Sequence, residues 1–77
     1  MAITYDDHAE FQIARRSIDK AWVEATLTDP DAVEISGRRR SVLKCLPGRR
    51  VMLRVVTPAD DVDFVITAYF DRTKPCV

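Results

Sequence analysis

Proton-transfer chemistry has one ready candidate in this 77-residue chain, because the chain contains a single histidine. His8 is the side chain that exchanges protons near neutral pH without help from its surroundings. In a helix it would share one face with Gln12 and Arg15. Alternatively, His8 is a packing or capping residue that hydrogen-bonds a neighbouring strand.

Phosphate-binding chemistry is suggested by a basic segment in the middle of the chain. Twelve Lys and Arg balance twelve Asp and Glu overall, yet residues 36–56 carry seven bases and no acids. Such a cluster would suit a phosphate-binding surface, or it would solvate a hairpin and pair with the acidic N-terminal third. The bases are Arg38, Arg39, Arg40, Lys44, Arg49, Arg50 and Arg54.

Further polar side chains are predicted to converge on one face of a sheet. Strand alternation puts Arg54 on one face of its strand, and Thr67 and Tyr69 on the matching face of the next strand. Lys44 joins them if its strand pairs in a suitable register, which the sequence does not fix. Alternatively, Arg54 pairs with Asp63 or another strand acid, and the other two residues reflect strand propensity alone.

The elements that would position these residues are two helices followed by strands. Asp7 can cap a helix over residues 8–16, and Ser17 can cap a second helix that ends at residues 28–31. After Gly37 the pattern changes to short Val- and Leu-rich runs separated by turn signals. Strands are predicted at about residues 39–46, 50–57 and 62–70, with a short edge strand at 32–35.

This order of elements predicts an α+β fold, in which two N-terminal helices pack on one face of a three- to four-stranded antiparallel sheet. Residues 1–70 are expected to form a single domain and residues 71–77 a mobile tail. The dry layer under the helices is predicted to contain Val51, Leu53, Val55, Phe64, Ile66, Ala68 and Phe70.

Composition excludes several classes of protein. Cys45 and Cys76 form at most one bridge, which excludes a disulfide framework, and Cys45 is expected to be a buried strand residue. One His, no Cys-x-x-Cys and only two Gly leave no zinc or nucleotide-binding motif, so no metal and no cofactor are expected. No apolar run approaches the ~20 residues of a membrane span, and no signal peptide is recognisable. A cytoplasmic protein without membrane contact is therefore expected.

Short motifs in both halves of the chain carry a family resemblance. They are His8-Ala9, Arg16-Ser17-Ile18, Val23, Leu27, Pro30 and Val65-Ile66-Thr67-Ala68-Tyr69. With them the chain resembles a family of small bacterial domains of unknown function. That family is similar to the RelE and BrnT toxins of the ribonuclease superfamily that includes barnase, EndoU and colicin nucleases. The resemblance implies a toxin-like RNA-binding domain or a metal-independent ribonuclease, held by an acidic antitoxin.

Metal-free RNA cleavage needs a group that takes the 2′-hydroxyl proton, a group that protonates the leaving oxygen, and cations around the phosphorane. Gln12 stands where the family's helix motif has an Arg, and its amide brings no charge to a phosphate. Whether the domain cleaves RNA or only binds it therefore stays open. The predicted site residues are His8, Arg54 and Tyr69 for catalysis, and Arg16, Lys44 and Thr67 for substrate binding.

A second function is a non-catalytic protein-interaction module that docks a partner on a sheet edge or on the mixed face. The basic residues discriminate between the two functions. Free cations that face one groove favour RNA, whereas cations paired with acids such as Glu34 or Asp63 favour the structural account. Arg16 has a structural alternative of its own, a tie to Glu24. The oligomeric state is not predicted.

Overall fold

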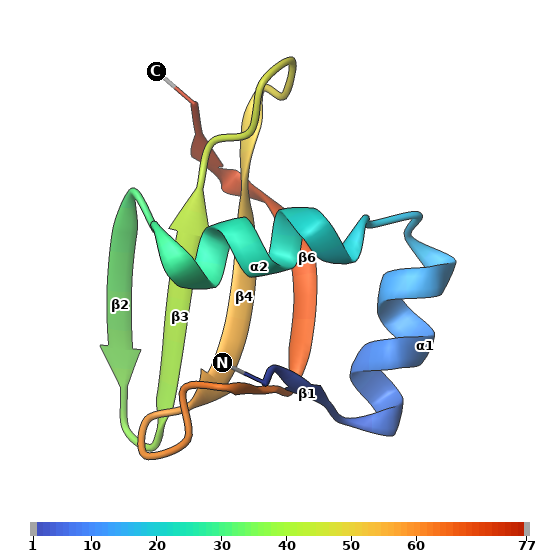
Figure 1. Cartoon of the computed structure of the whole chain (residues 1–77). Coiled ribbons are helices and arrows are strands. Elements are labelled where there is room, and N and C mark those ends of the chain that lie inside the picture. The colour runs from blue at the N-terminus through green and yellow to red at the C-terminus, as the bar shows by residue number, and fades with distance from the viewer. Residues whose placement is uncertain (1, 77) are drawn as a thin grey trace.

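The computed structural model describes residues 2–76, and these form two helices and an antiparallel sheet (Figure 1). The predicted α+β fold is confirmed. The helices are α1 (Asp7–Arg15) and α2 (Lys20–Thr28). The strands are β1 (Thr4–Tyr5), β2 (Ala32–Ser36), β3 (Arg39–Lys44), β4 (Val51–Pro58), β5 (Phe64–Val65) and β6 (Thr67–Pro75).

α1 begins one residue earlier than predicted. Its N-cap is Asp6, whose carboxylate accepts a hydrogen bond from the backbone N–H of His8 at 3.2 Å. A side-chain oxygen at this position satisfies one of the N–H groups that a helix start leaves free. Ala9 and Ile13, one turn apart, are the buried residues of α1. They fix which side of the helix faces the sheet.

α2 is capped by Asp19 rather than by Ser17. The Asp19 carboxylate accepts from the backbone N–H of Ala21 at 2.9 Å. Ser17 instead has a left-handed φ of 55°, a conformation that commonly ends a helix. α2 crosses one face of the sheet (Figure 1) and contacts β3 and β4. Among residues 2–76 no helix is long and apolar enough to cross a membrane.

The main sheet has the strand order β2-β3-β4-β6, and every neighbouring pair is antiparallel. β1 and β5 form a separate two-stranded parallel sheet. β2 and β6 are therefore the edges of the main sheet. α1 lies beside β6, and β2 lies at the opposite edge (Figure 1).

The core lies between the sheet and the helices. Leu53 and Val55 are fully buried there, as the alternation predicted. The prediction was wrong for Phe64 and Ile66, which are half-buried, while Val65 between them is fully buried. The expected strand 62–70 is interrupted at Ile66, and the interruption resets the alternation of side chains between β5 and β6.

The C-terminal segment belongs to the sheet where a mobile tail was expected. β6 continues to Pro75, and the backbone N–H of Cys76 donates to the carbonyl of Arg50 at 2.8 Å. Residues 72–74 bulge out, since Met52 pairs with Asp71 and Val51 pairs with Pro75. Residue 77 of the expected tail lies outside the described residues.

The two cysteines bond to each other. Cys45 follows the end of β3 and is half-buried, and its partner Cys76 lies just beyond β6. Cys45 is therefore not the buried strand thiol that the sequence suggested. The bond joins two segments 31 residues apart and fastens the end of β6 to the connection between β3 and β4.

Candidate functional site

Three of the predicted site residues share the sheet face opposite α2. Arg54 on β4 is the register partner of Tyr69 on β6, and Val56 is the partner of Thr67. Directly paired residues point to the same face, and so do residues two apart on a strand. The convergence of Arg54, Thr67 and Tyr69 that the alternation predicted is thus present.

Arg54 is the centre of an ion-pair network on this face. Its Nε donates to Asp71 Oδ2 at 2.8 Å, and its Nη1 and Nη2 both donate to Glu34 Oε1 at 3.3 Å. Lys74 Nζ reaches the other oxygen of Glu34 at 2.7 Å. The side chain of Arg54 is only 12% exposed. The charge of Arg54 is therefore balanced by acids within the fold. Arg54 orders the side chains of this face and is not a free cation for a ligand.

The titration of these groups reflects the network. Partial burial disfavours the charged guanidinium of Arg54, but the Asp71 hydrogen bond and the Glu34 charge outweigh burial and raise its pKa. The hydrogen bond from Lys74, followed by the charge of Arg54, lowers the pKa of Glu34. Hydrogen bonds from the side chain and backbone of Thr73, and then from Arg54, lower the pKa of Asp71 from its usual 3.8 to about 2.

Asp71 should make the free energy of unfolding depend on pH under acidic conditions. Its pKa is lower in the folded state than in the unfolded chain, so its contribution is fully present above pH 3.8 and is lost as the pH falls toward about 2. We expect Asp71→Asn to flatten the fall in the free energy of unfolding across this window, measured by urea denaturation at several pH values. Asp60→Asn, an exposed carboxylate in a turn, is the matched control and should keep the slope. An unchanged slope in Asp71→Asn would contradict this role.

Arg16 joins the site from α1. Its Nη1 donates to the backbone carbonyl of Ala68 at 3.1 Å, which satisfies an acceptor on β6. Its guanidinium carbon lies 5.8 Å from the centroid of the Tyr69 ring, within the range of a cation–π contact. The suggested tie to Glu24 is not made; Arg16 bonds to the sheet instead. Tyr69 therefore lies between two arginines, the exposed Arg16 and its register partner Arg54.

Lys44 does not join this face. Its register partner is Leu53, which lies in the core beneath the helices. Its Nζ donates to the backbone carbonyl of Asp29 at 2.9 Å and lies 3.6 Å from the Asp29 carboxylate. Lys44 thus fastens the end of α2 to β3, on the opposite side of the sheet from Arg54.

His8 also lies apart from the other candidates. It is exposed in the first turn of α1, whereas Arg16 follows the last turn. Eight residues of helix separate them by about 12 Å along the axis. Neither His8 nor Lys44 is brought to the side chains around Tyr69.

The basic segment is divided between different surfaces. Arg54 and Lys44 are paired with acids, as the structural account expected. Arg49 lies over the rings of Trp22 and Phe70, at 5.1 and 4.5 Å from their centroids. Arg38 lies in the β2–β3 turn, at the far end of β3 from Arg49. These charges do not form one groove.

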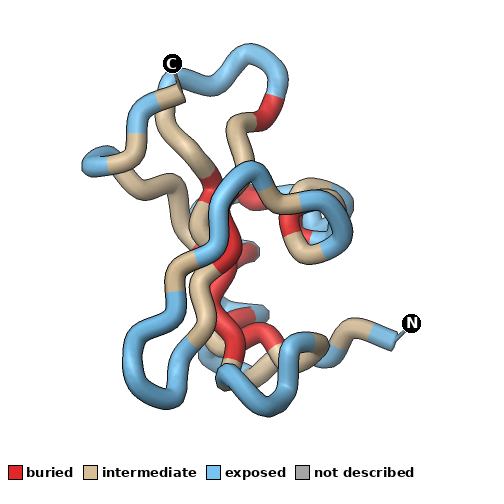
Figure 2. The backbone as a smooth tube through the Cα atoms, turned by 90° about the vertical axis from the view of Figure 1, so that its left-hand side faces the viewer, coloured by how far each residue is buried: buried red, intermediate tan, exposed pale blue. Residues whose placement is uncertain are grey.

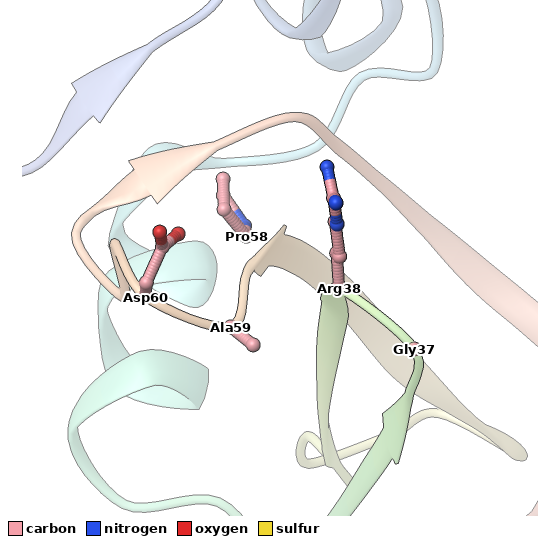
Figure 3. A pocket seen from close by; sticks show the side chains of 5 residues that line it. All are labelled: Gly37, Arg38, Pro58, Ala59 and Asp60. Carbon is pink, nitrogen blue, oxygen red and sulfur yellow. The ribbon is translucent and has the colours of Figure 1, made fainter.

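A shallow pocket lies at the β2–β3 hairpin, away from the candidate site. Gly37, Arg38, Pro58, Ala59 and Asp60 line it. Figure 3 shows the side chains of Arg38 and Asp60 on either side of Pro58. Among residues 2–76 there is no group of three or more His, Cys, Asp and Glu placed to hold a metal ion.

Sequence reasoning missed Asp71 and Lys74 because both fell in the expected tail. The sequence indicates Glu34 only as one of several acids able to pair with the basic segment. The alternating pattern of residues 67–71 carried the missing signal, since Asp71 follows Thr67 and Tyr69 at the same two-residue spacing.

The folded region corresponds to a known domain family. The family model described as Domain of unknown function (DUF4258) matches residues 5–70. The chain belongs to this family. Comparison with curated proteins and with solved structures gives no match. The family's description assigns no activity, so the function of this DUF4258 domain has to be argued from the side chains of its site.

Proposed function

We propose that this DUF4258 domain binds single-stranded RNA on the sheet face opposite α2, with Tyr69 as a stacking platform and Arg16 as the cation that contacts the phosphate. The single observation that carries the proposal is the position of the half-buried Tyr69 ring between the exposed Arg16 and the fixed Arg54. Single-stranded RNA is commonly held by an aromatic ring that stacks on a base while nearby cations follow the backbone.

The charges near this ring support the assignment of roles. The charge of Arg54 is neutralised by Glu34 and Asp71. Arg16, in contrast, donates one N–H to a backbone carbonyl and remains exposed. Arg16 therefore keeps donors for a phosphate oxygen. Thr67 lies on the same face and can add a hydroxyl donor.

The same geometry favours binding over cleavage. General acid–base catalysis requires a proton-transfer group within hydrogen-bond reach of the reacting atoms. His8 is exposed at the other end of α1, and Gln12 brings no charge. An acidic antitoxin, which the resemblance to toxins implies, would compete with RNA for this face by offering carboxylates to Arg16.

The proposal is tested with a short fluorescent single-stranded RNA. Tyr69→Ala should weaken binding by about tenfold, since loss of base–aromatic stacking costs about 1–3 kcal/mol. Arg16→Gln should weaken binding and also reduce its dependence on salt, because one phosphate contact is lost. Fluorescence anisotropy at two salt concentrations measures both effects.

Two variants serve as controls. Tyr69→Phe keeps the ring and should bind nearly as tightly as the wild type. Arg50→Gln changes an exposed arginine just before β4 and should have a smaller effect than Arg16→Gln. RNA left intact and unbound at every salt concentration would argue against the proposal and favour the protein-interaction module. Cleavage in excess EDTA that disappears in His8→Ala would instead show a ribonuclease.

A further inference from the structure

The two edges of the main sheet differ in whether another element covers them. The β6 edge is covered by α1, and the Ala68 carbonyl on this strand accepts a hydrogen bond from Arg16. The β2 edge faces outward, and four of its five residues are exposed (Figure 2). Val33 and Ile35, two apart on β2, are 47% and 67% exposed. β2 thus presents an open backbone edge with two apolar side chains on one face.

β2 lacks the features that usually prevent edge strands from pairing. Those features are prolines, bulges and charged side chains that point inward. The strand contains no proline and no lysine, and its pairing with β3 is continuous. Its single charge, Glu34, lies on the face opposite Val33 and Ile35 and is already paired with Arg54 and Lys74.

The charges at the two ends of β2 are of opposite sign. Asp31 immediately precedes the strand and Arg38 lies in the turn that follows it, and both are exposed. An antiparallel copy of β2, related by a two-fold axis, would bring the acidic end of each strand to the basic end of the other. This edge is therefore complementary in charge to itself.

We propose that β2 pairs antiparallel with β2 of a second copy of this chain, which joins the two four-stranded sheets into one. Pairing centred on Glu34 sets Val33 of one copy beside Ile35 of the other, and Asp31 beside the turn that carries Arg38. The two facing Glu34 carboxylates are compensated by Arg54 and Lys74 within each copy. This dimer goes beyond RNA binding, because it uses the sheet edge farthest from α1 and Arg16.

Sedimentation equilibrium of the full chain over a range of concentrations tests the dimer. The wild type should approach twice the 8.8 kDa mass of one chain as concentration rises. Ile35→Lys should raise the dimer dissociation constant at least about tenfold, since it puts a charge into the paired apolar row. Phe11→Lys is the matched control. Phe11 is 59% exposed on α1, so this variant should dimerise like the wild type.

A charge exchange makes the test specific to this pairing. Arg38→Glu alone should weaken the dimer, because it sets a second negative charge near Asp31 of the other copy. The double variant Asp31→Lys/Arg38→Glu should restore dimerisation, since both charges of each contact across the interface are reversed together. A wild type that stays monomeric at every concentration, or an Ile35→Lys variant that dimerises as the wild type does, would overturn the proposal. An RNA-binding failure leaves this result unaffected.

Discussion

Replacing Arg54 with methionine is expected to lower the free energy of unfolding by about 2 kcal/mol. The substitution keeps the long side chain but removes the charge that bonds to both Asp71 and Glu34. The Arg54 and Asp71 side chains are only 12% and 13% exposed, so solvent replaces their ion pair poorly. The loss should exceed that for an exposed ion pair, which is commonly below about 1 kcal/mol.

Urea denaturation at neutral pH measures this effect. Arg39→Met is the matched control, because Arg39 is an exposed arginine of the same sheet and makes no ion pair within residues 2–76. It should change stability little. Arg54→Lys should fall between the wild type and Arg54→Met, since one ammonium group cannot reproduce the forked contacts of the guanidinium. Equal stability of Arg54→Met and Arg39→Met would contradict the positioning role of Arg54.

Reduction of the Cys45–Cys76 bond is expected to lower the free energy of unfolding by about 3 to 4 kcal/mol. The bond closes a loop across a sequence separation of 31, and a cross-link of this length restricts the unfolded chain by about that amount. Such a loss is a large share of the stability of a small domain. Reduction should also loosen residues 72–76, which the bond fastens beside Arg50.

The comparison is urea denaturation with and without a reducing agent. The wild type should show a lower midpoint after reduction, and the double variant Cys45→Ala/Cys76→Ala should already have the lower midpoint and should not respond to the reductant. Hydrogen exchange at residues 72–76 should rise in parallel. A midpoint that is the same under both conditions would show that the bond contributes nothing to stability.

Much of the fold could be predicted because local patterns determine it. The helix-to-strand order, the edge strand and the face shared by Arg54, Thr67 and Tyr69 all follow from periodicity within single elements. The N-cap residues differ from the predicted ones, because several acids and serines near the helix starts can fill the N-cap position. The break at Ile66 could not be foreseen, since it depends on β5 pairing with the distant β1.

The site was harder to predict because its electrostatics are non-local. The role of Arg54 is determined by Glu34 and Asp71, which lie 20 and 17 residues away in the sequence. The side of the sheet on which Lys44 lies depends on the β3–β4 register, and the bond between Cys45 and Cys76 depends on how far β6 extends. Contacts of this kind are set by the assembled sheet and not by sequence spacing.

The central claim is that RNA binds beside Tyr69, and NMR chemical-shift mapping tests it most directly. A short single-stranded RNA is titrated into the isotope-labelled domain at low and moderate salt. We predict that the largest changes occur at Arg16 and along residues 67–71, and that they shrink at the higher salt concentration. Changes confined to α2 or to the hairpin around Arg38, or no changes at either salt concentration, would contradict the assignment of this face as an RNA-binding site.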